Sequence, residues 1–311
     1  MKNLKIIGIV LVTAIAVLLL FISYDTGKEK NKKPIVAVTT FALYDITKHI
    51  AGDTVEVVHI LPFGVDPHSF EPTPRLMAKI EKSSLLIYSG AGLEPWVHGF
   101  KNRDKMIDMS KYVRLRKLGE DEHELHDHHG PDCIHNMTDP HYWLDFANMQ
   151  RMTVVITAAL SKLLPENKAY YEENKKRYIA MLQKLDKAYR TKLSSCKADT
   201  VVVSHNALGY LSRNYGFHVE SLTGLSPEAQ PSAKDVTRIM DDIQKEGVRT
   251  IFFEHFVNDK VIKRIAKDTH IDLEVFQPLG NITKDEAAAH LSYEDIMYRN
   301  LDKLSKALVC N

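Results

Sequence analysis

Three histidines of this chain stand in settings that suit a metal ligand. His68 lies in the motif Asp-Pro-His-Ser-Phe-Glu-Pro, His141 lies in Asp-Pro-His-Tyr-Trp-Leu-Asp, and His205 follows the apolar run 201–203 and one serine. A proline fixes its own φ, so the approach to His68 and to His141 is stiff. Three imidazole nitrogens and one oxygen suit zinc better than magnesium or calcium, which prefer oxygen ligands. We therefore predict that these three imidazoles bind one metal ion, with Zn(II) as the expected metal.

Acidic residues beside these histidines can accept a hydrogen bond from the ring nitrogen that does not bind the metal. The candidates are Asp66, Glu71, Asp139 and Asp145. In the alternative interpretation each histidine is an ordinary hydrogen-bonded core or surface residue. Three histidines in matched motifs favour the metal site.

A second group of histidines lies between the His68 motif and the His141 motif. The segment 121–135 mixes acids with His123, His126, His128, His129 and His135, and it has almost no apolar residues. This composition predicts a surface loop without regular structure. Neutral histidines and carboxylates together favour weak auxiliary metal capture, and a solvated loop without function is the alternative.

Apolar runs of strand type alternate with helical spacing in two parts of the chain, which predicts an α/β fold with mostly parallel sheets. The expected strands are 35–39, 55–61, 85–89, 106–109, 200–204, 217–222, 250–253 and 273–276. The expected helices are 41–50, 74–81, 207–215, 232–246, 258–269 and 293–308.

Between these parts, 146–164 and 166–193 have helical patterns with no strand between them. We therefore predict two α/β lobes with parallel sheets, 34–145 and 194–311, joined by a long helical spine, 146–193. Ligands of open α/β sheets bind beyond the carboxyl ends of the strands. The three histidines are accordingly expected at the junction of the lobes.

The N-terminal segment 1–33 has the pattern of an export signal. A short basic stretch precedes the uncharged run 6–22, and a lysine-rich tether follows at 27–33. The run is long enough to stay uncleaved as a membrane anchor, so we expect a periplasmic or other extracytoplasmic location. Export permits a disulfide. We expect it between Cys196 and Cys310, because Cys133 lies in the histidine-rich segment.

The composition excludes several classes of function. A formal net charge of +1 over 311 residues gives no support for a nucleic-acid partner. No GxGxxG or GxxxxGK[ST] motif indicates a nucleotide site. HExxH is absent as well, and no serine or cysteine nucleophile is paired with a marked base, so we expect no enzyme. A zinc hydrolase is the less favoured alternative.

Four motifs in order resemble the zinc/manganese solute-binding proteins of ABC importers, the cluster A-I receptors, over about Ile35 to Cys310. Besides the settings of His68, His141 and His205, the fourth motif is Gly-Leu-Ser-Pro-Glu-Ala-Gln-Pro-Ser at 224–232. The resemblance implies a cleft metal site on these histidines and delivery to a membrane permease. The histidine-rich segment is typical of zinc-selective members. We thus expect a monomeric high-affinity Zn(II) receptor; a manganese receptor or an adhesin on the same fold are the alternatives.

Three residues depart from the family pattern. Gln277 stands before Pro-Leu-Gly, where the family often has an Asp or Glu as fourth ligand. Phe146 replaces a proline and Gln230 replaces a glutamate. Gln277 is the candidate for the fourth position, with water or Glu71 as substitutes. Its neutral side chain argues against manganese, which favours oxygen donors.

Overall fold

The computed structural model describes residues 32–118, 138–225, 229–256 and 259–311. One compact unit spans Ile35–Asn311. The export signal predicted at the N-terminus and the five histidines of 121–135 lie outside the described residues. None of the described helices combines the length and the hydrophobicity needed to cross a bilayer.

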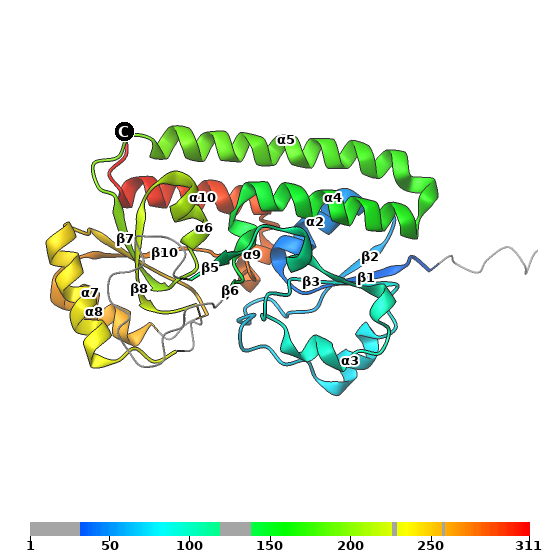
Figure 1. The fold of residues 1–311 in the computed structure, drawn as a ribbon, viewed down its shortest axis with the longest axis horizontal. Helices are drawn as coiled ribbons and strands as arrows, with labels where there is room; N and C mark the ends of the chain where they lie inside the picture. The colour runs from blue at the N-terminus through cyan, green and yellow to red at the C-terminus, as the bar shows by residue number, and fades with distance from the viewer. Residues whose placement is uncertain (1–31, 119–137, 226–228, 257–258) are drawn as a thin grey trace, which may run out of the picture. The chain divides into compact units, whose positions relative to one another are not determined.

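The N-terminal sheet contains four parallel strands in the order β2-β1-β3-β4. The strands are β1 (Ile35–Val38), β2 (Glu56–His59), β3 (Leu85–Tyr88) and β4 (Met106–Asp108). Helices α2 (Phe41–Ala51) and α3 (Pro74–Ile80) lie on opposite sides of this sheet (Figure 1). Because α2 covers one face and α3 the other, β1 is an apolar run without alternation.

The C-terminal sheet is also parallel, with the order β10-β9-β7-β8. Its strands are β7 (Thr200–His205), β8 (His218–Thr223), β9 (Thr250–Phe253) and β10 (Asp272–Val275). The helices α6 (Gly209–Tyr215), α7 (Ala233–Glu246) and α8 (Lys260–Thr269) alternate with them. Every residue of β7 is buried, as expected for an inner strand covered on both faces. At the start of α7, Ser232 and Asp235 form a capping box.

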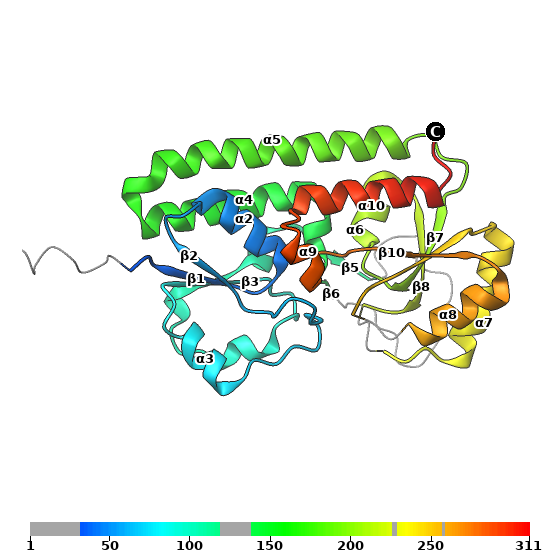
Figure 2. The ribbon, with the colours of Figure 1, turned by 180° about the vertical axis from the view of Figure 1, so that it is seen from behind.

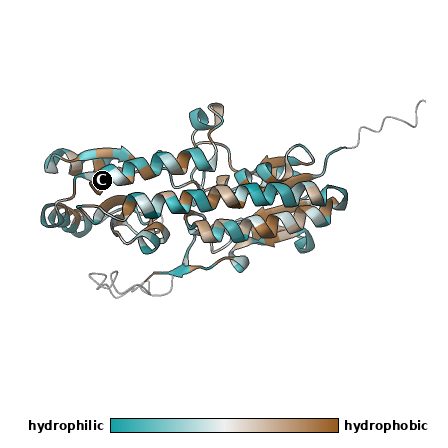
Figure 3. Ribbon diagram, turned by 90° about the horizontal axis from the view of Figure 1, so that it is seen from above, coloured by the Kyte–Doolittle hydropathy of each residue, from teal (hydrophilic) through white to brown (hydrophobic). Residues whose placement is uncertain are grey.

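Long helices cross both sheets and join them. They are α4 (Phe146–Leu163), α5 (Lys168–Leu193) and α10 (Tyr293–Ala307), which run along one side of the molecule in both views (Figures 1 and 2). From above, the three helices lie side by side and turn many hydrophilic residues outward (Figure 3). Their inner faces share one core, in which the Tyr189 hydroxyl of α5 donates to the Met297 carbonyl of α10. The prediction of two parallel-sheet lobes joined by a helical spine is confirmed.

Short elements complete the fold. An antiparallel pair of strands, β5 (Arg116–Lys117) and β6 (Thr138–Asp139), flanks residues 119–137. Helix α9 (Lys284–Ala288) precedes α10, and its capping box joins Thr283 and Glu286. The 3₁₀ helices are η1 (Pro95–Gly99), η2 (Arg103–Lys105), η3 (Met109–Tyr112), η5 (Tyr142–Leu144) and η6 (Pro165–Asn167).

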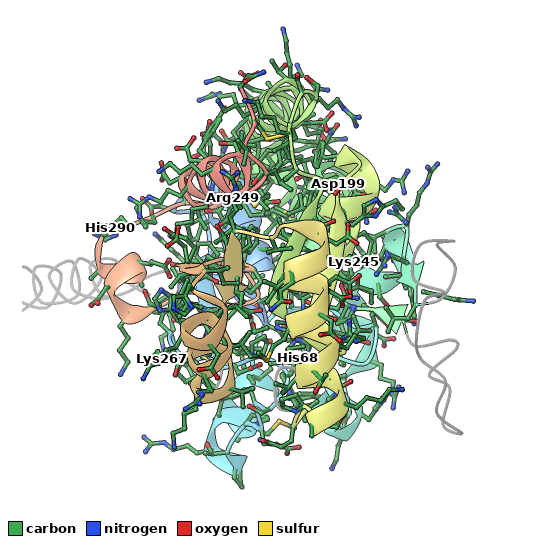
Figure 4. All side chains as sticks on the ribbon, turned by 90° about the vertical axis from the view of Figure 1, so that its left-hand side faces the viewer. His68, Asp199, Lys245, Arg249, Lys267 and His290 are labelled. Carbon is green, nitrogen blue, oxygen red and sulfur yellow. A yellow bond between two sulfur atoms is a disulfide. The ribbon has the colours of Figure 1, made fainter. Side chains whose placement is uncertain are left out.

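Cys196 and Cys310 form the expected disulfide, drawn as a yellow bond in Figure 4. It ties the residues after α10 to the segment that leads into β7. The predicted domain limits at 145/146 and 193/194 stay a prediction.

Candidate metal centre

Three imidazole rings converge on one point of the described structure. His141 Nε2 lies 3.2 Å from His68 Nε2 and 3.3 Å from His205 Nε2. One ring nitrogen of each of the three histidines lies within 4.8 Å of the others. Zinc with tetrahedral ligands and Zn–N bonds of about 2.0–2.1 Å requires nitrogens about 3.3–3.4 Å apart. The two measured spacings therefore match the edges of a zinc tetrahedron that meet at His141.

Two of the histidines end or follow strands of the parallel sheets, and the third follows the short antiparallel pair. His205 is the last residue of β7. His68 lies in the loop after β2, and His141 lies just before η5 and α4. In the end-on view of Figure 4, the label of His68 is seen between α7 and α8, the helices nearest the viewer. The carboxyl ends of one strand in each parallel sheet thus supply His205 and His68, at the edge where α/β sheets bind ligands.

Asp139 orients the ring of His141. One carboxylate oxygen, Oδ1, lies 2.9 Å from His141 Nδ1 and also accepts the backbone N–H of His141 at 2.9 Å. The other oxygen accepts from Arg116 Nη1 at 3.2 Å, and all three side chains are buried. A proton held on Nδ1 leaves the lone pair of Nε2 for a metal. Asp139 therefore has the position that the sequence predicts for an orienting carboxylate.

Glu254 holds the corresponding place at His205, and sequence reasoning missed it. Its Oε1 lies 2.5 Å from His205 Nδ1. The two groups are in charge contact, although the alignment is not that of a hydrogen bond, and Nδ1 has no hydrogen-bond partner. Glu254 directly follows β9, which pairs with β7. The only sequence signal for Glu254 was an acidic residue directly after an apolar strand.

The pKa values of two rings move in opposite directions. Burial, together with the nearby His141 and His205, lowers the pKa of His68 to about 2, so that its ring is neutral. Burial also acts to lower the pKa of His205, but the carboxylates around it, Glu254 first, outweigh burial and leave the pKa above its ordinary value.

Other predicted residues have different contacts. Gln277 donates from Nε2 to Glu286 Oε2 at 2.9 Å, and its Oε1 accepts the Leu279 N–H at 3.3 Å. Its role as a fourth ligand stays a prediction that would require the amide oxygen to leave Leu279. Asp145 caps α4 by accepting two backbone N–H groups, and Asp66 accepts the backbone N–H of His68 at 2.7 Å. The remaining residues singled out from sequence are exposed Glu71, exposed Gln230, and Phe146, which is buried at the start of α4.

A small pocket adjoins the histidines. Its volume of about 10 Å³ is close to the space that one water molecule needs. His68, His141, Asp66 and Glu254 contribute to its wall. A larger cavity of about 590 Å³ lies beside the first turn of α4 and is lined by none of the three clustered histidines. The chemistry of the donor atoms, rather than cavity size, marks the three histidines as the candidate metal centre.

Two parallel-sheet lobes, a helical spine and a three-imidazole cluster between the sheets define a class of two-lobed metal-binding receptor. The comparison with known families agrees with this class. The chain belongs to the family described as the periplasmic component A of the zinc-uptake complex, ZnuA, whose family model matches residues 36–307. The resemblance predicted from the four motifs is therefore confirmed.

Curated relatives carry names that refer to zinc. The high-affinity zinc uptake system protein ZnuA of Bacillus subtilis is 34% identical over 289 residues, which cover 91% of this chain and 90% of that protein. The zinc-binding lipoprotein AdcA of Streptococcus pneumoniae is 31% identical over 293 residues, 93% of this chain. The match spans 58% of AdcA, which is the longer protein.

Solved structures share the fold. The metal-dependent lipoprotein YcdH of Bacillus subtilis has a TM-score of 0.74 at 33% identity and covers 89% of this chain and 100% of its own. The Zn(II)-bound ZnuA-like domain of Streptococcus pneumoniae AdcA has a TM-score of 0.73 at 29% identity, with 89% and 99% coverage. The laminin-binding protein Lmb of Streptococcus agalactiae, described as an adhesin with metal-transporting activity, has a TM-score of 0.77 at 27% identity, with 88% and 99% coverage.

Proposed function

We propose that this protein is an extracytoplasmic receptor that binds one Zn(II) ion as cargo and delivers it to an ABC import permease. The observation that carries the proposal is the pair of Nε2–Nε2 distances, 3.2 and 3.3 Å, around His141. His68, His141 and His205 are the proposed ligands. A water molecule completes the shell, because Gln277 is engaged with Glu286 and Leu279.

Zinc is the proposed cargo rather than manganese. Imidazole nitrogen suits zinc, whereas manganese favours carboxylate and other oxygen donors. The two carboxylates nearest the rings, Asp139 and Glu254, face Nδ1 atoms rather than the space between the three Nε2 atoms. The site therefore offers nitrogen at three positions, which favours Zn(II).

The family supports the partner and the compartment. Its description is that of a periplasmic component of a zinc-uptake complex, so a membrane permease is the proposed receiver of the metal. We further propose that residues 1–33 direct export and that the receptor acts as a monomer without enzymatic activity. The histidines of 121–135 are proposed to capture additional zinc weakly near the site.

The decisive experiment is a competition titration of the purified, metal-free protein. Zinc is titrated against a chromophoric chelator, and manganese is titrated in parallel by calorimetry. We expect tight binding of one zinc at the main site and weaker binding of manganese. Failure to bind zinc, or tighter binding of manganese, would overturn the proposal. Turnover of ester or phosphate substrates by the zinc-loaded protein would instead support a hydrolase.

A further inference from the structure

We propose that Glu254 is the positioning residue of His205 and supplies the negative charge that the zinc site lacks at position 277. The inference rests on the proposed function, since it concerns the same site. It names a residue that neither the motifs nor the family pattern singled out.

The sheet places Glu254 at His205. Strand β9 pairs with β7 in the register Val202 to Ile251 and Val203 to Phe252. Extending that register by two residues brings Glu254 opposite His205. Glu254 is the first residue after β9, so the pairing of two inner strands anchors its backbone beside His205. This is a more rigid support than a loop would give to a ligand-orienting group.

The contact is on the ring nitrogen that does not face the cluster. Glu254 Oε1 meets His205 Nδ1 at 2.5 Å, while His205 Nε2 lies 3.3 Å from His141 Nε2. An imidazole can carry its proton on one nitrogen, in charge contact with a carboxylate, and bind a metal through the other. In this arrangement Glu254 acts on the metal through His205 and not as a ligand. It stabilises the tautomer that is protonated on Nδ1 and increases the basicity of Nε2.

Glu254 and Asp139 each contact the Nδ1 atom of one histidine, but they differ in whether a positive side chain compensates their charge. The second oxygen of Asp139 pairs with Arg116 at 3.2 Å, so the charge of that carboxylate is compensated. Among the described residues, Glu254 forms an ion pair with His205 and with no lysine or arginine. Its side chain is only 12% exposed, so water screens its charge poorly. A divalent cation at the three Nε2 atoms would therefore be stabilised by the whole charge of Glu254.

This assignment also accounts for the neutral residue at 277. Gln277 binds Glu286, a member of the capping box of α9, and thus belongs to the structure of the C-terminal segment. A carboxylate behind a histidine can compensate part of the cation's charge without occupying a coordination position. The site keeps its nitrogen-rich donor set while it gains a negative charge.

The test compares Glu254→Gln, Glu254→Asp and Glu254→Ala with the unchanged protein. Glu274→Gln is the matched control, because Glu274 lies on the adjacent strand β10, is half exposed and pairs with Lys303. Zinc affinity is measured by chelator competition and zinc release by stopped flow. The absorption bands of the Co(II)-loaded protein report ligand geometry, and thermal unfolding of the metal-free proteins reports stability.

We expect Glu254→Gln to weaken zinc binding about 10–100-fold, the usual effect of removing a group that orients a metal ligand. Glu254→Ala should weaken it further and shift the Co(II) bands. Glu254→Asp, which keeps the charge, should retain more affinity than Glu254→Gln. Glu274→Gln should bind zinc as the unchanged protein does.

Unchanged zinc affinity and Co(II) bands in Glu254→Gln would overturn the inference while leaving the receptor function intact. Equal losses in Glu254→Asp and Glu254→Gln would overturn the role of charge. If the unchanged protein fails to bind zinc, the proposed function itself fails, so the two failures are distinguishable. If Glu254→Gln or Glu254→Ala is unfolded before metal is added, the comparison uses Glu254→Asp and the unchanged protein, because the shorter aspartate side chain fits the same space.

Discussion

His141 and His205 are 64 residues apart in the chain, yet their Nε2 atoms lie 3.3 Å apart. His141 stands just before the helical spine, and His205 ends a strand of the C-terminal sheet. The cluster therefore forms only when the segment before the spine and the C-terminal sheet are both folded in place. A metal ion bound there would link the two parts and stabilise the folded protein by an amount that grows with the logarithm of its affinity.

Replacing His141 by alanine should remove the central ligand. We expect zinc affinity to fall by more than about 100-fold, because even groups that only orient a ligand are worth about 10–100-fold. Chelator competition measures the change. His98→Ala is the control, since His98 is exposed in η1, far along the chain from the three motifs. Wild-type affinity in His141→Ala would contradict the ligand assignment.

Replacing Gln277 by alanine should separate stability from metal binding. Its amide makes two hydrogen bonds within a buried environment, so we expect a loss of about 1–3 kcal/mol in the free energy of unfolding. Zinc affinity should stay within about threefold, a fraction of the effect of an orienting group. Denaturant unfolding and calorimetry measure the two quantities. A large loss of zinc affinity at unchanged stability would show that Gln277 is a ligand.

Deleting residues 121–135 should change the amount of zinc bound rather than the tight affinity. The segment carries five histidines, whereas His68, His141 and His205 lie outside it. We expect the number of zinc ions bound at high concentration to fall and the dissociation constant of the tight site to be preserved. Equilibrium dialysis with metal analysis gives the stoichiometry. An identical stoichiometry in the shortened protein would exclude auxiliary capture.

The stability of the metal-free protein should decrease as pH rises from about 6.5 to about 9. The hydrogen bond to Asp45 is the main cause that raises the pKa of His49 to about 9, while burial opposes it. The unfolded chain has a histidine pKa of about 6.5. The folded state therefore binds the proton more tightly, so this stabilisation is complete below pH 6.5 and is lost as pH passes 9.

The His49→Gln variant tests that assignment. Its stability should be flatter over the same pH range in urea unfolding experiments. Half of the His49 side chain is exposed, so solvent screens the pair and the effect is expected to be modest. If the His49→Gln variant shows the same pH dependence of stability as the unchanged protein, a group other than His49 causes it.

Replacing Cys196 and Cys310 by serine should destabilise the fold but spare the metal site. The disulfide closes a loop with a sequence separation of 114 residues, for which chain entropy predicts a loss of about 4–5 kcal/mol. Cys196 lies before β7, and His205 is at the far end of that strand, which is about 20 Å long. Urea unfolding should reveal the loss. A parallel drop in zinc affinity would mean that the disulfide also positions His205.

Long periodic segments were predictable from sequence because many residues contribute to each pattern. The expected helix 146–164 and the expected strand 250–253 correspond closely to α4 and β9. The pair β5–β6 was missed, because two residues per strand carry no period. Helix α9 was also missed, although its Thr-x-x-Glu capping box was readable in the sequence.

The histidine cluster was predictable because matched motifs surround His68 and His141. Glu254 was not found, since its partner is set by the pairing of β9 with β7, which a single sequence does not show. Of the four acids proposed to orient rings, Asp139 contacts an imidazole nitrogen directly. Asp145 instead caps α4, which reflects the strong preference of aspartate for that position.

The antiparallel pair of Arg116–Lys117 with Thr138–Asp139 has a consequence for how members of this family can diverge. Arg116 and Asp139 face each other across this pair and are also joined by an ion pair. The sequence between them can therefore lengthen or shorten at little thermodynamic cost, since doubling a loop costs about 0.6 kcal/mol. Asp139 would still hold His141. A new metal-capturing or reporter sequence could therefore be placed between the two strands without redesigning the receptor around it.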